Sequence, residues 1–184
     1  AAGLAFGKIC AMAGINLPVN VEFMECWVTG VVDPIESPSL TLSWTYPFFV
    51  FTQRKTGNLV IMGNQLDFKG VPDNMRDLQS SRRVSDAASY ILRAFPWLKD
   101  VKIIRHWFGP IPTTTDNHPI LGTVEEVEGF YLQGLLCGHG FLLAPMISKV
   151  MSELILNQSP TISIEDLSYK RFQTGKLLET HALL

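Results

Sequence analysis

The sequence is poor in charge, and this scarcity excludes several classes of protein. Charged residues make up 17% of its 184 residues, while hydrophobic residues make up 47%. Since ordinary globular domains carry about 25% charged residues, the chain is neither disordered nor a coiled coil. Lysine and arginine together number 15, against 17 aspartates and glutamates, so the net charge is −2. Because the chain has no basic excess, we do not expect it to bind nucleic acid.

Cysteines and long apolar runs are also scarce. The three cysteines, Cys10, Cys26 and Cys137, are widely spaced and odd in number, which supports neither a disulfide framework nor a zinc knuckle. Apolar runs such as residues 141–146 are far shorter than the roughly 18–20 residues that a membrane span needs. No basic-then-apolar signal segment opens the chain. We therefore expect a reducing, cytoplasmic setting and no membrane span.

Alternating apolar residues predict a sheet made largely of hairpins. In residues 19–28 the apolar positions alternate up to Phe23 and then shift by one residue, which predicts a strand with a bulge. Residues 40–53 and 59–62 are strand-like runs joined by a four-residue connection that contains glycine, which is a hairpin signal. Strands outnumber helices, so the predicted fold class is α+β with an antiparallel sheet and packed helices.

Helical periodicity occurs in three places. The first dozen residues, residues 81–95 and the segment that Pro145 opens each have apolar side chains three or four residues apart. Pro96 should end the second of these helices, because proline cannot continue one. The apolar stripe that should pack on the sheet consists of Val84, Ala88, Ile91 and Phe95.

Residues 105–122 depart from ordinary packing patterns. Three prolines, two glycines and a run of threonines predict a stiff, extended loop, which loses less entropy on ordering against a ligand than a flexible loop does. The alternative is a buried crossover between strands. His106 and His118 have no cysteine or carboxylate at metal-ligand spacing, so we expect no metal site.

Residues 136–145 lead from a predicted strand into a predicted helix. Gly138 and Gly140 flank His139, and glycines let the backbone approach a flat or anionic group closely. The N–H groups of the following helix would attract negative charge. The alternative is a tight strand-to-helix turn. His139 could act as a general base, although a histidine in a turn is more often a hydrogen-bonding spacer.

Residues 44–51 form a strongly aromatic segment. Side chains of this kind are most often core, but they could equally wall an apolar substrate cavity. Under the second alternative the candidate substrate contacts are Phe49 and Phe51.

Taken together and in order, these segments resemble the C-terminal half of the D-amino-acid-oxidase-like FAD-dependent oxidoreductases, the superfamily of glycine oxidase, the sarcosine oxidases and amino-acid dehydrogenase subunits. Residues 107–122 fit the family pattern W-x-G-x-x-P-x-T-x-D-x-x-P-x-x-G. Residues 138–145, followed by a helix and Arg171-Phe172, fit its closing flavin-side segment. Residues 57–63 are similar to a hairpin of its substrate domain, and residues 1–3 to a strand end near the FAD.

The resemblance implies a division of the chain. Residues 19–104 would form a substrate-binding antiparallel sheet with its helix. Residues 1–18 and 105–172 would form the flavin-facing, C-terminal part of an FAD/NAD(P)-binding-type domain, and residues 173–184 would be a tail. The resemblance also implies that an amine or amino acid, such as the secondary amines sarcosine and proline or a glycine-like compound, transfers a hydride to flavin N5.

The resemblance further implies a set of site residues. The backbone of residues 138–142 would face the negative charge of the reduced flavin, and no catalytic acid or base is required. The FAD would be non-covalent, because residues 107–122 contain no cysteine. The implied FAD contacts are Gly3, Gly109, Pro112, Gly138, His139, Gly140, Phe141 and Leu142, and the implied substrate contacts are Phe49, Phe51 and His139.

The chain departs from the family in three respects. It has no G-x-G-x-x-G turn for the FAD pyrophosphate, which implies a missing N-terminal half or a partner subunit. Ile111 stands where several members have a substrate-binding arginine, and Leu142 stands where monomeric sarcosine oxidases have a lysine. These departures favour the alternative that the chain is a non-catalytic subunit or scaffold that binds only protein partners. An unrelated α+β binding domain is the third possibility.

Overall fold

Two compact units make up the chain in the computed structural model. Residues 1–21 and 111–183 form the first unit, and residues 22–110 form the second unit. The substrate-binding and flavin-facing roles that the sequence assigns to residues 19–104, and to residues 1–18 with 105–172, stay predictions. The residues that the structure describes are 2–35, 39–42, 49–66, 88–89, 91–156 and 158–179.

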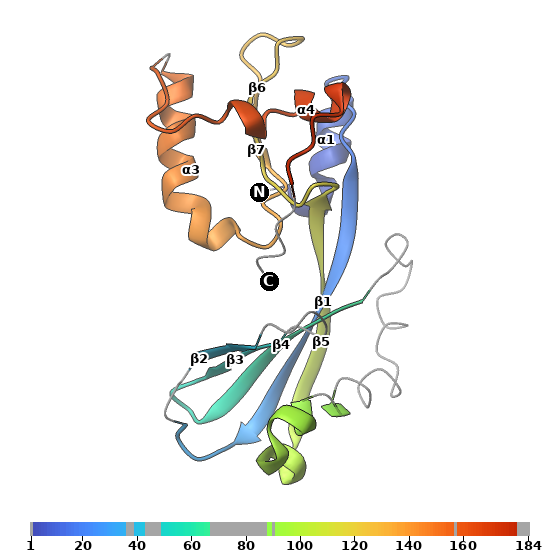
Figure 1. Ribbon diagram of the computed structural model, residues 1–184, viewed down its shortest axis with the longest axis vertical. Helices are drawn as coiled ribbons and strands as arrows, with labels where there is room; N and C mark the ends of the chain where they lie inside the picture. The colour runs from blue at the N-terminus through green and yellow to red at the C-terminus, as the bar shows by residue number, and fades with distance from the viewer. Residues whose placement is uncertain are drawn as a thin grey trace. The chain divides into compact units, whose positions relative to one another are not determined.

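The main sheet has five strands in the order β2-β3-β4-β1-β5 (Figure 1). The pairings of β1 with β4, of β2 with β3 and of β3 with β4 are all antiparallel, which confirms the predicted α+β class. Most of this sheet belongs to the second unit, while the first residues of β1 and the last residues of β5 belong to the first unit. The strands are β1 (Val19–Val31), β2 (Ser39–Leu42), β3 (Phe49–Gln53), β4 (Asn58–Leu66) and β5 (Ile103–Thr114).

Strands β3 and β4 form the predicted hairpin, but the run predicted at residues 40–53 contains two strands, β2 and β3, which pair with each other. The Gly57 N–H donates to the Arg54 carbonyl at 2.8 Å, and the Arg54 N–H donates to the Asn58 carbonyl at 2.9 Å. Gly57 has a φ of +85°, a conformation that glycine adopts readily. The register of β1 against β4 shifts between Phe23 and Glu25, which confirms the irregularity that the shift of apolar positions predicts.

Ile91, a residue of the apolar stripe predicted in residues 84–95, is buried in the core of the second unit. Residues 91–94 are helical and the 3₁₀ helix η3 (Pro96–Asp100) follows, so Pro96 ends the helix as predicted. Ile91 is 4% exposed and packs against the sheet, whereas Val84 lies outside the described residues. One buried cluster of this unit consists of Trp27, Phe51, Leu59, Ile61, Ile91 and Leu98.

Strand β5 corrects the first part of the loop predicted at residues 105–122, and within that segment residues 115–119 lie outside the strands. The chain stays extended in the sheet through Thr114 and turns only after it. Pro110 and Pro112 fit within the strand because β5 is an edge of the sheet, where one side of a strand needs no ladder hydrogen bonds. The prolines therefore mark an edge strand rather than a loop.

The first unit packs helices on both faces of the β6–β7 hairpin (Figure 1). Ile120 packs in a cluster with Cys10 and Tyr169, while the adjacent Leu121 packs with Ile147 and Met151. Successive residues of a strand point to opposite faces, so the two clusters lie on opposite sides of the hairpin. The elements of this unit are η1 (Gly3–Ala5), α1 (Phe6–Met12), β6 (Ile120–Thr123), β7 (Tyr131–Gly134), α3 (Gly140–Ile155), η4 (Glu165–Leu167) and α4 (Lys170–Thr174).

Helix α3 begins at Gly140, so the prediction that Pro145 opens this helix is wrong. Pro145 lies inside the helix. The Leu143 N–H donates to the His139 carbonyl at 3.0 Å, which closes the first helical turn before the proline is reached. A proline at this position removes one intrahelical hydrogen bond, but the helix is held by its buried side chains Ile147, Val150 and Met151.

Candidate functional site

The turn segment, which we define as residues 135–142, joins β7 to α3 and contains five of the eight predicted flavin contacts. Leu135, Cys137 and Gly138 have φ values of +49°, +50° and +80°. Gly138 is exposed, and Phe141 and Leu142 are 99% and 78% exposed. The segment therefore presents bare backbone and apolar side chains at the N-terminus of a helix.

The two glycines of the turn segment are glycine for different reasons. A Cβ at Gly138 would meet no atom within 4 Å, so the observed restriction at that position is its φ of +80°. A Cβ at Gly140 would lie 3.0 Å from Leu136 Cδ1. The close approach of Leu136 therefore restricts a side chain at Gly140, whereas no neighbouring atom restricts one at Gly138.

His139 takes part in the turn through its backbone. Its N–H donates to the Leu136 carbonyl at 2.9 Å, and its carbonyl accepts the N–H of Leu143. The half-buried side chain makes no capping hydrogen bond to α3. These contacts suit the hydrogen-bonding spacer that is the simpler interpretation of this histidine, and its contacts with FAD or substrate stay predictions.

The other predicted FAD contacts lie in separate elements. Gly109 and Pro112 belong to β5, and a Cβ at Gly109 would meet no atom within 4 Å. Gly3 opens η1, is exposed, and has a φ of +50°. Because Gly109 falls in the second unit and the others in the first, their joint contact with one FAD stays a prediction.

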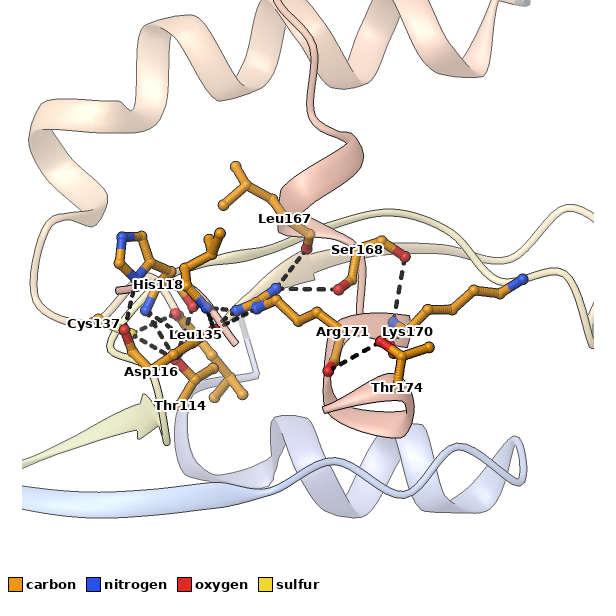
Figure 2. Close-up of polar contacts among 11 residues, drawn as sticks. Thr114, Asp116, His118, Leu135, Cys137, Leu167, Ser168, Lys170, Arg171 and Thr174 are labelled. Atoms are coloured by element: carbon orange, nitrogen blue, oxygen red, sulfur yellow. Dashed lines mark hydrogen bonds and ion pairs between the residues drawn. The ribbon is translucent and has the colours of Figure 1, made fainter. Parts of the chain in front are cut away.

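A buried ion pair that the sequence analysis does not predict lies behind the turn segment. Asp116 and Arg171 are 2% and 5% exposed, and Arg171 donates from Nε to Asp116 Oδ2 at 2.6 Å and from Nη2 to Oδ1 at 3.1 Å. Figure 2 shows Arg171 reaching from α4 toward Asp116, with Thr114 and Cys137 beyond it. Asp116 belongs to the family pattern at residues 107–122, and Arg171 to the closing segment of the family. Membership of these motifs was the sequence signal that could have singled out both residues.

The ionised form of Asp116 is strongly favoured. Burial raises the pKa of its carboxyl, but hydrogen bonds from Arg171 and Thr114 and the charge of Arg171 outweigh burial and lower the pKa to about 2. The Leu178 N–H also donates to Asp116 Oδ2 at 3.3 Å. This carboxylate therefore acts as a fixed structural anion that holds the C-terminal residues.

The second unit buries a different acid–base pair. Glu25 is 2% exposed, and its Oε1 lies 2.5 Å from His106 Nε2. Among the described residues, Glu25 Oε2 and Trp27 Nε1 have no hydrogen-bond partner. The sequence signal for Glu25 is an acidic residue between the apolar residues Met24 and Cys26 of a predicted strand, which the sequence analysis passes over.

Of the two predicted substrate contacts in β3, the structure describes the side chain of Phe51. The Phe49 side chain lies outside the described residues. Phe51 is 4% exposed, and its ring meets Phe95 edge to face at a centroid distance of 4.6 Å. Core packing therefore explains Phe51 without a substrate, and the substrate roles of both residues stay predictions. No three metal-ligating side chains gather within the part of the chain that the structure describes.

The family of FAD dependent oxidoreductases matches residues 1–154, and the chain belongs to this family. It is 25% identical over 174 residues to the beta subunit of sarcosine oxidase from Rhodobacter capsulatus, with 93% of this chain and 39% of that protein covered. It is 27% identical to glycine oxidase from Bacillus subtilis, with 86% and 40% covered. The structure of L-proline dehydrogenase from P. horikoshii matches with a TM-score of 0.81 and 25% identity over 97% of this chain and 47% of that one.

These comparisons confirm the resemblance that the motifs indicate. The chain spans about two fifths of the length of the curated relatives named here, so the activity of the whole protein stays a matter of proposal. Within the described ranges, the longest apolar helices fall short of what a membrane crossing requires.

Proposed function

We propose that this chain is the substrate- and flavin-contacting portion of an enzyme that oxidises an amine or amino acid. The substrate class is a secondary amine such as sarcosine or proline, or a glycine-like compound, because relatives bear the names sarcosine oxidase, glycine oxidase and L-proline dehydrogenase. The observation that carries the proposal is the exposed turn segment, in which Gly138 has open space beside it and Phe141 and Leu142 lie uncovered.

The residues of the turn segment suit a flavin. Bound FAD would supply the redox chemistry by accepting a hydride from the substrate at N5. The first N–H groups of α3 have no intrahelical acceptor, and the positive end of the helix dipole favours negative charge. These N–H groups would stabilise the negative charge that develops during hydride transfer. Phe141 and Leu142 would exclude water from the ring, and Gly138 would allow its close approach.

Further features of the proposal concern binding. The FAD is non-covalent, because no cysteine lies in residues 107–122. The pyrophosphate site comes from another part of the protein or from a partner subunit, as the sarcosine oxidase relative is itself named a beta subunit. Ile111 and Leu142 cannot bind a substrate carboxylate through charge, so that group is held elsewhere. We also propose that the enzyme is cytoplasmic.

The test compares Gly138→Ala with Gly129→Ala in the full-length protein. The two glycines form a matched pair, because both are exposed, have φ values of +80° and +73°, and have no atom within 4 Å of an added Cβ. Both substitutions therefore introduce the same left-handed strain. We expect the FAD dissociation constant to rise about tenfold or more only for Gly138→Ala, since a methyl group would intrude on the ring.

Equal FAD affinity in the two variants would contradict the proposal. Acid denaturation should release the flavin from the wild-type protein, and flavin retained on a peptide from residues 107–122 would contradict non-covalent binding. Sarcosine, proline or glycine should bleach the flavin absorbance under anaerobic conditions. A full-length protein that binds no FAD would instead support the scaffold alternative.

A further inference from the structure

The turn segment has a backbone conformation that needs outside support. Leu135 and Cys137 have φ values of +49° and +50°, in the left-handed region that bulky L-residues rarely occupy. They precede Gly138, the residue with open space beside it. Residues in such conformations persist where surrounding contacts determine them, so the contacts of this turn identify what fixes its position.

Burial and two sulfur contacts hold the turn. Leu135 and Cys137 are 4% and 6% exposed. The Cys137 thiol donates to the Leu135 carbonyl at 3.0 Å, and Cys137 Sγ lies 3.6 Å from Thr114 Oγ1. Thr114 is the last residue of β5, so its hydroxyl connects that strand to the turn segment.

The Thr114 hydroxyl is also connected to the ion pair. It lies 2.9 Å from Asp116 Oδ1 and 2.8 Å from the His118 carbonyl, and it accepts the His118 N–H at 3.0 Å. All of these partners belong to the first unit. One buried hydroxyl therefore joins the turn segment to the loop that carries Asp116.

Arg171 completes the network from the C-terminal side. Its five N–H groups are all engaged: three hydrogen bonds reach Asp116 and the His118 carbonyl, and two reach the carbonyls of Leu167 and Ser168. A planar guanidinium with all its donors in use fixes geometry as well as charge. The continuous path Arg171–Asp116–Thr114–Cys137 thus runs from α4 to the turn segment (Figure 2).

We propose that Thr114, Asp116 and Arg171 are positioning residues that hold the turn segment against the flavin. The network fixes the left-handed turn so that Gly138 and the first N–H groups of α3 keep one position. This inference rests on the proposed function, which assigns the turn segment to flavin contact. A purely structural network would change the stability of the unit without changing the properties of bound flavin.

The test uses Thr114→Val in the full-length protein, because valine keeps the shape of threonine and removes the hydroxyl. Thr114→Ser restores the hydroxyl and is the rescue variant. Thr174→Val is the matched control, since the exposed Thr174 hydroxyl donates within its own helix, to the carbonyls of Lys170 at 3.2 Å and Arg171 at 3.5 Å. Arg171→Lys is a second variant, which keeps the charge and loses the bidentate geometry.

Two readouts separate the position of the turn from its contact with flavin. The first is the labelling rate of Cys137 by a thiol reagent in flavin-free protein, measured by peptide mass spectrometry. Cys10 is the internal reference, because it is 1% exposed, lies in the same unit, and has a thiol pKa that burial raises. The second readout is the FAD dissociation constant together with the midpoint potential of the bound flavin.

We expect Thr114→Val to label Cys137 about fivefold faster relative to Cys10, and to raise the FAD dissociation constant about fivefold, as the loss of one net hydrogen bond predicts. The flavin potential should shift, and Thr114→Ser and Thr174→Val should resemble wild type. Unchanged Cys137 labelling in both Thr114→Val and Arg171→Lys would overturn the positioning role. Faster labelling with unchanged flavin affinity and potential would show a positioned turn that does not contact flavin, which would overturn the inference together with the proposed function.

Discussion

Among the described residues, each unit contains a buried carboxyl group beside a basic side chain, and the two pairs differ in how many of their hydrogen-bonding groups have partners. Asp116 in the first unit accepts hydrogen bonds on both oxygens, from Arg171 and from neighbours that include Thr114. Glu25 in the second unit contacts His106 through Oε1, while its Oε2 has no partner among the described residues. Both carboxylates are 2% exposed, so burial alone does not separate them.

This difference in hydrogen bonding indicates how much each pair contributes to the stability of its unit. Removing two charges from water is costly, and the attraction between them compensates only when their remaining hydrogen-bonding groups are also satisfied. The Asp116–Arg171 pair meets this condition and connects distant segments of one unit. The Glu25–His106 pair leaves Glu25 Oε2 without a partner among the described residues, so we expect the sheet to tolerate replacement of this carboxyl group by an amide.

The largest expected effect follows from removing the cation of the satisfied pair. Arg171→Met would leave Asp116 buried without its counter-charge, and the free energy of unfolding should fall by about 3–5 kcal/mol. Urea denaturation of the full-length protein measures this. Arg93→Met at an exposed position is the control and should change stability by about 0.5 kcal/mol or less. A loss below about 1 kcal/mol for Arg171→Met would remove the distinction between the two pairs.

Replacing each carboxyl group by an amide should lower the free energy of unfolding by different amounts at Asp116 and Glu25, and both losses should be smaller than that of Arg171→Met. Asp116→Asn would place an amide donor against the N–H groups of Arg171 and leave a buried cation uncompensated, which should cost about 2–3 kcal/mol. Glu25→Gln keeps an acceptor for His106 and replaces an oxygen that has no described partner, so it should cost about 1 kcal/mol or less. Equal losses in the two variants would show that the hydrogen bonds of the two carboxyl groups do not decide stability.

The smallest expected effect is a pH dependence that belongs to the first unit. The pKa of Asp116 is lowered from 3.8 to about 2 in the folded protein. Its ionised form therefore contributes stability above pH 3.8, and this contribution is lost as the pH falls from 3.8 through about 2. Stability measured by urea unfolding should decline over this window in wild type and decline less steeply in Asp116→Asn. If stability declines equally steeply with falling pH in wild type and in Asp116→Asn, other titratable groups cause the loss of stability in acid.

Local sequence patterns were sufficient for many elements. Glycine in the β3–β4 connection, the shift of apolar positions near Phe23 and the position of Pro96 each predict a feature that the structure contains. The start of α3 and the extent of β5 were predicted wrongly, because proline signals depend on surroundings. Pro145 follows a helical turn that has already closed, and Pro112 lies on a sheet edge.

For the candidate site too, the sequence was sufficient for some features, while others required the structure. Motif order alone identified the family and the glycines of the turn segment, since spacing along the chain is a property of the sequence. The separate reasons for Gly138 and Gly140 required coordinates, because the contact of a Cβ at Gly140 with Leu136 depends on how the turn folds back on itself. The same holds for Phe51, whose burial against Phe95 no local pattern could distinguish from a cavity wall.

The sequence by itself determined the fold class, the β3–β4 hairpin and the membership of the FAD-dependent oxidoreductase family, because these depend on periodicity and on motifs read along the chain. Only the tertiary structure decided which acidic and basic side chains pair. Asp116 and Arg171 are 55 positions apart, and Glu25 and His106 are 81 positions apart. Burial strengthens an interaction between such residues, but which of them meet is fixed by the packing of whole elements rather than by any neighbouring residue.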